Sequence, residues 1–138
     1  MQTAQIVIVG GGLSGLYAAY LLQQRGFRDY VLLEARDVLG GRIVSVPAAV
    51  PGSVLDAMAE AANRFDLGPS WFWPGYQRQL DHLVDELGLV RFEQFENGDM
   101  MVERSPHAVP ARMRGYASAP PSMRLMGGMA ALTNALHR

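Results

Sequence analysis

Three glycines near the start of the chain, Gly10, Gly12 and Gly15, have the spacing G-x-G-x-x-G. They follow the β-forming run Ile6–Val9 and precede a stretch of helical periodicity, so they lie on a turn between a strand and a helix. The first glycine permits a sharp turn, the second lets the backbone approach a bound group, and the third lets the helix pack closely on the strand. Because the first N–H groups of a helix have no partner within it, this turn can bind the pyrophosphate of a dinucleotide.

A predicted strand–helix–strand unit positions this turn and one acidic residue. The helix has an apolar face and is expected to end at Gly26, since glycine suits the position after a helix. The face is formed by Leu13, Leu16, Tyr17, Tyr20 and Leu21. The second strand covers residues 30–33 and ends on Glu34, where a carboxylate can accept hydrogen bonds from the hydroxyls of an adenosine ribose. The alternative is a glycine-rich turn that binds nothing, with Glu34 as an ordinary surface acid.

The composition of the chain excludes several kinds of chemistry. The 138 residues, 49% of them hydrophobic, are enough for one modest domain with a core. The net charge of −1 gives no reason to expect a nucleic acid or an anionic membrane as partner. Cysteine is absent, so disulfides and thiolate metal ligands are excluded, and we expect no metal site. All 12 basic residues are arginine, which excludes a lysine Schiff base within this chain.

The sequence contains no signal for a membrane or for export. No apolar run approaches the roughly 20 residues that span a bilayer. The first predicted strand begins within a few residues of Met1, which leaves no room for a signal peptide. We therefore expect a cytoplasmic protein.

Periodicity predicts further elements in the middle of the chain. We expect a short strand over residues 43–46, a short helix after residues 51–53, and a strand over residues 64–67. An amphipathic helix is then expected to end at Gly88, with a polar face on which His82 is exposed. Its apolar face is formed by Tyr76, Leu80, Leu83, Val84 and Leu87.

The last third of the chain has weaker patterns. The pair Asn97-Gly98 predicts a hairpin between strands over residues 90–95 and 100–103. Residues 104–126 contain four prolines and are expected to be irregular, although so long a stretch without elements is uncommon in a compact domain. Gly127-Gly128 then opens a final helix that runs through Leu136.

Three blocks of the sequence resemble the flavin-containing amine oxidases, the group of monoamine, polyamine and L-amino-acid oxidases. The first block is the glycine turn, residues 9–16, and the second is residues 33–42, with a glutamate and then a double glycine and an arginine. The third, residues 65–71, is similar to the segment beside the flavin ring, and residues 127–132 resemble a later helix start. The second block also occurs in phytoene desaturases and protoporphyrinogen oxidases, so it marks the superfamily rather than the substrate.

The resemblance implies an α/β fold class and the cofactor FAD. It implies a Rossmann-like FAD-binding βαβ unit in residues 1–74 and the start of a substrate-binding domain in residues 75–138. Arg42 would contact the phosphate or ribityl region, and Trp71 would lie beside the isoalloxazine. The implied cofactor-binding residues are Gly10, Gly12, Leu13, Ser14, Gly15, Glu34, Ala35, Arg36, Gly41, Arg42, Gly68, Pro69, Ser70 and Trp71. The alternatives are a surface salt bridge for Arg42, and core packing for Trp71 and Trp73.

The resemblance also implies an activity, the FAD-dependent oxidation of an amine by hydride transfer. Trp71 occupies the position of an arginine that grips the substrate carboxylate in L-amino-acid oxidases, which favours amines without an α-carboxylate. Family members are several times longer, so we expect an N-terminal fragment that is inactive alone, with unknown catalytic residues beyond Arg138. Its uncovered apolar faces predict self-association. The alternatives are a non-catalytic FAD- or nucleotide-binding module, a subunit of a split flavoenzyme, or an NAD(P)-dependent dehydrogenase.

Overall fold

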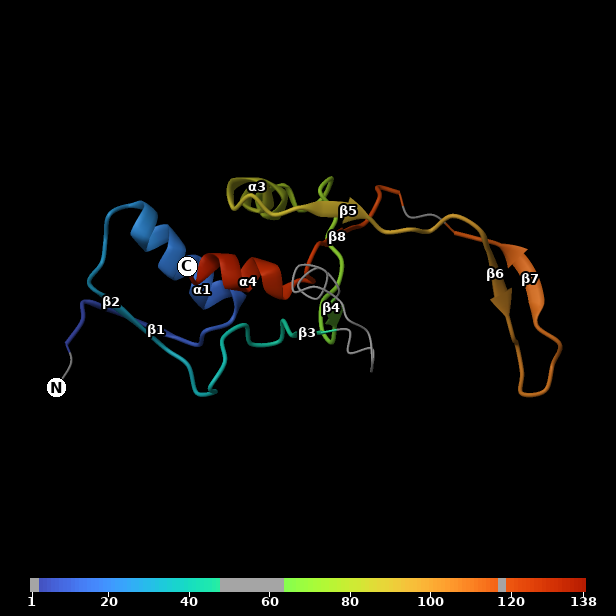
Figure 1. Cartoon of the computed structure of the whole chain (residues 1–138), viewed down its shortest axis with the longest axis horizontal. Helices are drawn as coiled ribbons and strands as arrows, with labels where there is room; N and C mark the ends of the chain where they lie inside the picture. Colours follow the sequence, from blue (N-terminus) through green and yellow to red (C-terminus); the bar gives the residue numbers. More distant parts are fainter. Residues whose placement is uncertain (1–2, 48–63, 117–118) are drawn as a thin grey trace, which may run out of the picture.

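The structure, a computed structural model, describes residues 3–47, 64–116 and 119–138. Its elements, in chain order, are β1 (Ile6–Val9), α1 (Leu13–Gln24), β2 (Tyr30–Leu33), β3 (Ser45–Pro47), β4 (Arg64–Asp66), α3 (Arg78–Glu86), β5 (Arg91–Glu93), β6 (Asp99–Val102), β7 (Ala111–Arg114), β8 (Met123–Leu125) and α4 (Ala130–Leu136). The molecule is elongated, with β1, α1 and β2 at one end and the β6–β7 ribbon at the other (Figure 1). The helix predicted after residues 51–53 lies outside the described residues.

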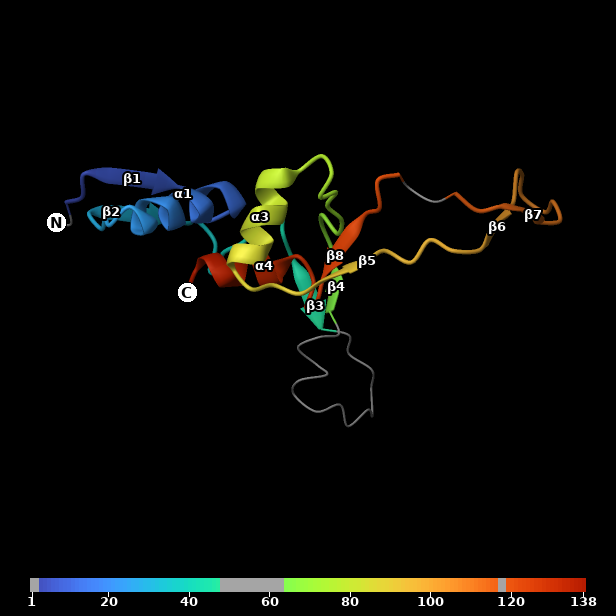
Figure 2. The ribbon, with the colours of Figure 1, turned by 90° about the horizontal axis from the view of Figure 1, so that it is seen from above.

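The predicted strand–helix–strand unit is confirmed. β1 and β2 pair in parallel, with Ile6 opposite Tyr30 and Val9 opposite Leu33, and α1 makes the connection between them. Gly26 follows the helix with φ +76°, a left-handed conformation that glycine adopts without a steric penalty. The helix lies along the two strands, and the other elements extend from its end near the glycine turn (Figure 2).

The core lies where α1, α3 and α4 meet the β5–β8 pair. Helices α1 and α4 are in contact. Among the residues that the structure describes, the largest fully buried side chains are Phe72, Val84 and Leu132. Phe72 is held by two backbone hydrogen bonds with Met123, which fix the aromatic segment against β8. The division of the chain into residues 1–74 and 75–138 stays a prediction.

The predicted hairpin around Asn97-Gly98 is wrong. β5 pairs antiparallel with β8, and β6 pairs antiparallel with β7, so the two strands expected to form the hairpin have different partners. The pairing of β5 with β8 places the strand beside Leu125, which is 2% exposed, and so joins it to the core. Gly98 has φ +124°, but it lies at the base of the β6–β7 ribbon rather than at a turn.

The prediction that residues 104–126 are irregular is also wrong, because they contain β7 and β8. β7 has four residues and β8 has three. β7 follows Pro110, and β8 comes soon after Pro120 and Pro121, so the prolines stand outside the strands, where they remove no ladder hydrogen bond. Strands this short give too few alternations for periodicity to reveal them.

Four smaller predictions are confirmed with shifted boundaries. The strand expected over residues 43–46 is β3, which begins at Ser45, and the one over residues 64–67 is β4. The amphipathic helix is α3, but Tyr76 precedes it and is 75% exposed, so this residue is not part of the apolar face. The final helix is α4.

None of the helices in the described ranges is long and apolar enough to cross a membrane.

Candidate functional site

The glycine turn has the geometry that its spacing predicts. Gly10 has φ +102°, and its N–H donates to the Leu33 carbonyl at 2.7 Å, so the chain turns sharply after β1. A Cβ atom at Gly15 would lie 1.9 Å from the Gly10 carbonyl oxygen, which only glycine avoids. At Gly12 an added Cβ would meet nothing nearer than the Gly41 Cα, at 3.9 Å. The third glycine therefore allows close packing, and the second leaves open space.

The double-glycine segment folds back against this turn. The Gly40 N–H donates to the Gly11 carbonyl at 2.8 Å, and Gly12 and Gly40 form an isolated parallel bridge. Arg36 Nη1 donates to the Gly41 carbonyl at 3.1 Å. The glycine turn and the double-glycine segment, about 30 residues apart in the sequence, thus lie against each other. The double-glycine segment brings Arg36 and Arg42 close to the turn.

Between these segments lies a hollow of about 680 Å³, here called the arginine hollow. It is lined by Val9, Gly10, Gly12, Leu13, Ser14, Gly15, Arg36, Gly40, Gly41, Arg42, Ile43 and Pro69. Two of these described lining residues are arginines and none is acidic, and the first turn of α1 contains no acid. Since the amino end of a helix carries partial positive charge, both the helix and the side chains favour an anion here.

Glu34 lies beside the arginine hollow and turns toward the glycine turn. Its Oε2 accepts the Gly11 N–H at 2.7 Å, and its Oε1 accepts the Arg36 N–H at 3.0 Å. These hydrogen bonds, Arg36 first and Gly11 second, lower the pKa of Glu34 below its ordinary value of 4.5 and outweigh the opposing effect of desolvation. Each carboxylate oxygen can accept a further hydrogen bond, so the group can still receive a hydroxyl.

The third sequence block is only partly brought to this hollow. Pro69 lines it, but Gly68, Ser70 and Trp71 do not. Of the residues predicted in the second block, Ala35 does not line it either. Gly68 packs against the loop all the same, because an added Cβ would lie 2.3 Å from the Arg42 carbonyl oxygen.

The aromatic cluster divides between core and surface. Phe72 is fully buried, whereas Trp71 is 50% exposed and donates its Nε1–H to Gln94 Oε1 at 3.0 Å. Core packing, the alternative given for Trp71 and Trp73, therefore does not hold for Trp71, and Trp73 is only partly buried.

A buried polar network that the sequence analysis missed holds α4 near the site. Asp66 Oδ1 accepts hydrogen bonds from the Ser45 hydroxyl at 2.6 Å and the Met129 N–H at 2.8 Å. Ser45 Oγ accepts the Ala130 N–H at 2.9 Å. Side chains from β3 and β4 thus cap a helix that lies more than 60 residues later, and sequence spacing contains no signal for such a contact.

The fold and the arginine hollow define a dinucleotide-binding α/β unit, and comparison with known proteins gives its family. The chain belongs to the family described as NAD(P)-binding Rossmann-like domain, whose model matches residues 8–87. Its relatives include flavin-containing amine oxidases, the group that the three sequence blocks resemble.

Individual relatives make this similarity concrete. The chain is 38% identical to a probable flavin-containing monoamine oxidase A of Dictyostelium discoideum over 71% of its own length, and 38% identical to the putrescine oxidase of Kocuria rosea over 68%. It superposes on a wild-type putrescine oxidase bound to putrescine with a TM-score of 0.58, at 31% identity over 83% of the chain. It covers 18%, 17% and 22% of these proteins, so it spans about a fifth of their length.

Proposed function

We propose that the chain binds FAD in the arginine hollow and forms the nucleotide-binding part of an amine oxidase-type oxidoreductase. The observation that carries the proposal is the lining of this hollow, a glycine turn with two arginines and no carboxylate among the described residues. Such a lining suits a diphosphate, whose negative charge the arginines and the helix end both attract. The named flavin-containing relatives support FAD as the dinucleotide.

The residues around the hollow fit the parts of this cofactor. The backbone at Leu13 and Ser14, in the first turn of α1, would hold the pyrophosphate, and Arg36 and Arg42 would pair with its charge. Glu34 would accept the ribose hydroxyls. The open space beside Gly12 fits this cofactor, because a side chain there would enter the space that a diphosphate needs.

The third sequence block would meet the other half of the cofactor. We propose that Gly68, Pro69, Ser70 and Trp71 lie beside the isoalloxazine, with Pro69 as the member that already lines the hollow. When bound, FAD supplies an acceptor for the hydride equivalent that leaves the carbon next to the amine nitrogen. The described residues would bind and orient this cofactor.

We propose further that this chain alone does not oxidise amines. It spans about a fifth of the length of its relatives, and the substrate-binding part would need much of the rest. Hydrogen peroxide release from the FAD-loaded chain with putrescine or benzylamine tests this. No release above the protein-free control is expected, whereas turnover by the chain alone would overturn the proposal of inactivity.

The second candidate is a nucleotide-binding module without its own chemistry, with NAD(P) as the competing ligand. The matched family is described as NAD(P)-binding, and this observation favours it. Parallel titrations of the purified chain with FAD and with NAD⁺ separate the two ligands. Saturable binding of FAD with at least tenfold weaker binding of NAD⁺ is expected on the proposal; the reverse order would replace it.

We also propose that the chain self-associates through the open face of the β1–β2 pair. Val7 and Val9 of β1 and Leu33 of β2 are 55%, 84% and 51% exposed, in a unit whose strands are normally covered on both faces. Sedimentation velocity tests this, with a concentration-dependent dimer or larger species expected. A monomer at all concentrations would contradict the proposal.

A further inference from the structure

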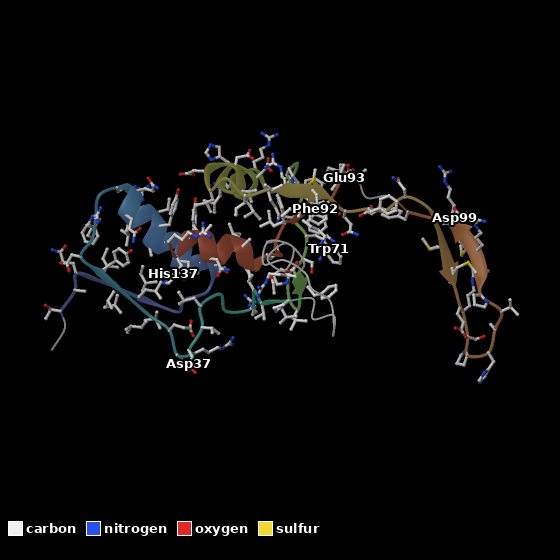
Figure 3. The ribbon with its side chains drawn as sticks, in the orientation of Figure 1. Asp37, Trp71, Phe92, Glu93, Asp99 and His137 are labelled. Carbon is white, nitrogen blue, oxygen red and sulfur yellow. The ribbon has the colours of Figure 1, made fainter. Side chains whose placement is uncertain are left out.

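A second hollow lies at the root of the β6–β7 ribbon, away from the glycine turn. Its volume is about 430 Å³, and it is here called the aromatic hollow. Its lining consists of Trp71, Trp73, Gln94, Glu96, Tyr116 and Ser122. Figure 3 shows Trp71 near Phe92 and Glu93, where the chain leaves β5 toward the ribbon. Three aromatic rings and one carboxylate therefore share one concave surface.

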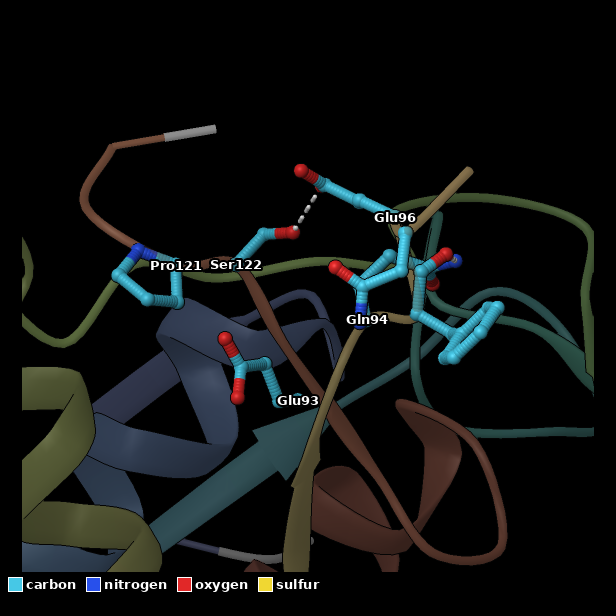
Figure 4. Close-up of a pocket in the computed structure, with 7 residues that line it drawn as sticks. Glu93, Gln94, Glu96, Pro121 and Ser122 are labelled. Atoms are coloured by element: carbon cyan, nitrogen blue, oxygen red, sulfur yellow. Dashed lines mark hydrogen bonds between the residues drawn. The ribbon is translucent and has the colours of Figure 1, made fainter. Parts of the chain in front are cut away.

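Several contacts hold the wall of the aromatic hollow in place. Trp71 donates its indole N–H to Gln94, and the Gln94 N–H donates to the Ser122 carbonyl at 2.9 Å. The Ser122 hydroxyl donates to Glu96 Oε1 at 3.1 Å, the bond drawn in Figure 4. The hollow is thus built where three chain segments meet, and its carboxylate is anchored by a side-chain hydrogen bond.

The charged side chains that line this hollow and the smaller one beside it are carboxylates. A smaller hollow of about 150 Å³ adjoins it, shares Gln94, Glu96 and Ser122 with it, and adds the carboxylate of Glu93 (Figure 4). None of the described residues that line either hollow is an arginine or a histidine. The arginines of the nearby strands β5 and β8 are paired with acidic residues outside the two hollows. Arg91 pairs with Asp81 and Asp85, and Arg124 pairs with Asp66.

We propose that the aromatic hollow is a binding site for an organic ammonium ion, such as a protonated alkylamine or a quaternary amine. Aromatic faces attract such cations through their quadrupoles, most strongly when the ring is tryptophan, and a carboxylate at the rim adds direct attraction. The volume is within the range of small-molecule pockets. The inference extends the proposed function, since amines are ammonium ions in neutral water, but it requires neither FAD nor turnover.

Tryptophan fluorescence of the 138-residue chain tests this proposal directly. The chain has two tryptophans, Trp71 and Trp73, and both line the hollow, so the whole indole signal reports on it. Titration with choline is expected to change the emission and to saturate. The matched probe is 3,3-dimethyl-1-butanol, which has the same shape without the charge, and it is expected to produce little change.

Two variants and one control locate the site. Glu96→Gln is expected to weaken choline binding about fivefold, and Tyr116→Ala about twofold to fivefold. Tyr116 is 78% exposed, so its removal should leave the far-ultraviolet circular dichroism unchanged. Glu103→Gln, which removes an exposed carboxylate outside both hollows, should leave choline affinity unchanged.

The same titration distinguishes this inference from the proposed function. Choline binding by a chain that fails to bind FAD would support the ammonium site and reject the FAD proposal. The inference is overturned if choline causes no saturable change, if the neutral alcohol acts equally, or if Tyr116→Ala binds choline as tightly as the unaltered chain does.

Discussion

The two larger hollows described above have opposite chemistry. The arginine hollow is lined by Arg36, Arg42 and a helix amino end, whereas the aromatic hollow is lined by three aromatic rings and Glu96. They also differ in how the sequence builds them. The first comes almost entirely from two short blocks, residues 9–15 and 36–43, and the second needs segments near residues 71, 94 and 120 that meet through strand pairing. A site built from contiguous blocks can be recognised in the sequence, and one built by distant pairing cannot.

The largest effect is expected from Gly15→Ala in the glycine turn. The added Cβ would lie 1.9 Å from the Gly10 carbonyl oxygen, so α1 must move away from β1. We expect a loss of about 2–3 kcal/mol in the free energy of unfolding, as for other overpacked sites, together with loss of FAD binding. Urea unfolding measures the first and calorimetric titration the second. An unchanged unfolding midpoint would show that this contact does not hold the turn.

Gly12→Ala separates cofactor binding from folding. The added methyl group meets only the Gly41 Cα at 3.9 Å, so the free energy of unfolding should change by less than about 1 kcal/mol. The methyl group would enter the open space of the arginine hollow, and FAD affinity should fall by at least about tenfold. The same two measurements apply. Equal FAD affinity in the variant and the unaltered chain would place the diphosphate elsewhere.

Arg42→Gln tests the charge of the arginine hollow. Losing a charge-assisted hydrogen bond to a phosphate should weaken FAD binding by about tenfold. Arg28→Gln is the control, because Arg28 is exposed and does not line the hollow. Both variants should leave choline binding at the aromatic hollow unchanged. If the two substitutions reduce FAD affinity equally, the effect is one of net charge and the hollow is not the site.

The smallest expected effect is a pH dependence of stability that comes from the Glu34 carboxylate. Its pKa is lowered by the Arg36 and Gly11 N–H groups, so its ionised form is the one that the fold favours. The resulting stabilisation is complete above pH 4.5 and is lost as the pH falls through the lower pKa of the folded chain. The difference in urea midpoint between the chain and Glu34→Gln should therefore shrink below pH 4.5. A difference that stays constant with pH would show that the carboxylate charge plays no part.

The parts of the fold that the sequence predicted share a local cause. Gly10, Gly12 and Gly15 act on neighbours within a few residues, and β1, α1 and β2 follow one another directly, so spacing alone predicts them. The second block was predicted from its resemblance to a family, and the structure places Gly41 and Arg42 opposite the turn.

The parts that the sequence did not predict depend on distant partners. β5 finds β8 about 30 residues later, because β8 includes the buried Leu125, and the Asn97-Gly98 signal does not compete with that burial. The cap that Ser45 and Asp66 provide for α4 spans up to 85 residues. Contacts of this kind form through three-dimensional packing between distant segments. Neither the periodicity of a sequence nor its turn propensity can predict them.

The central claim, that a dinucleotide diphosphate occupies the arginine hollow, is tested most directly by calorimetric titration of the purified chain with FAD, repeated on Gly12→Ala. The account predicts saturable binding of one FAD per chain, weakened at least about tenfold by the substitution while the urea midpoint stays nearly the same. Absence of FAD binding by a folded chain, or binding that Gly12→Ala leaves intact, would contradict it.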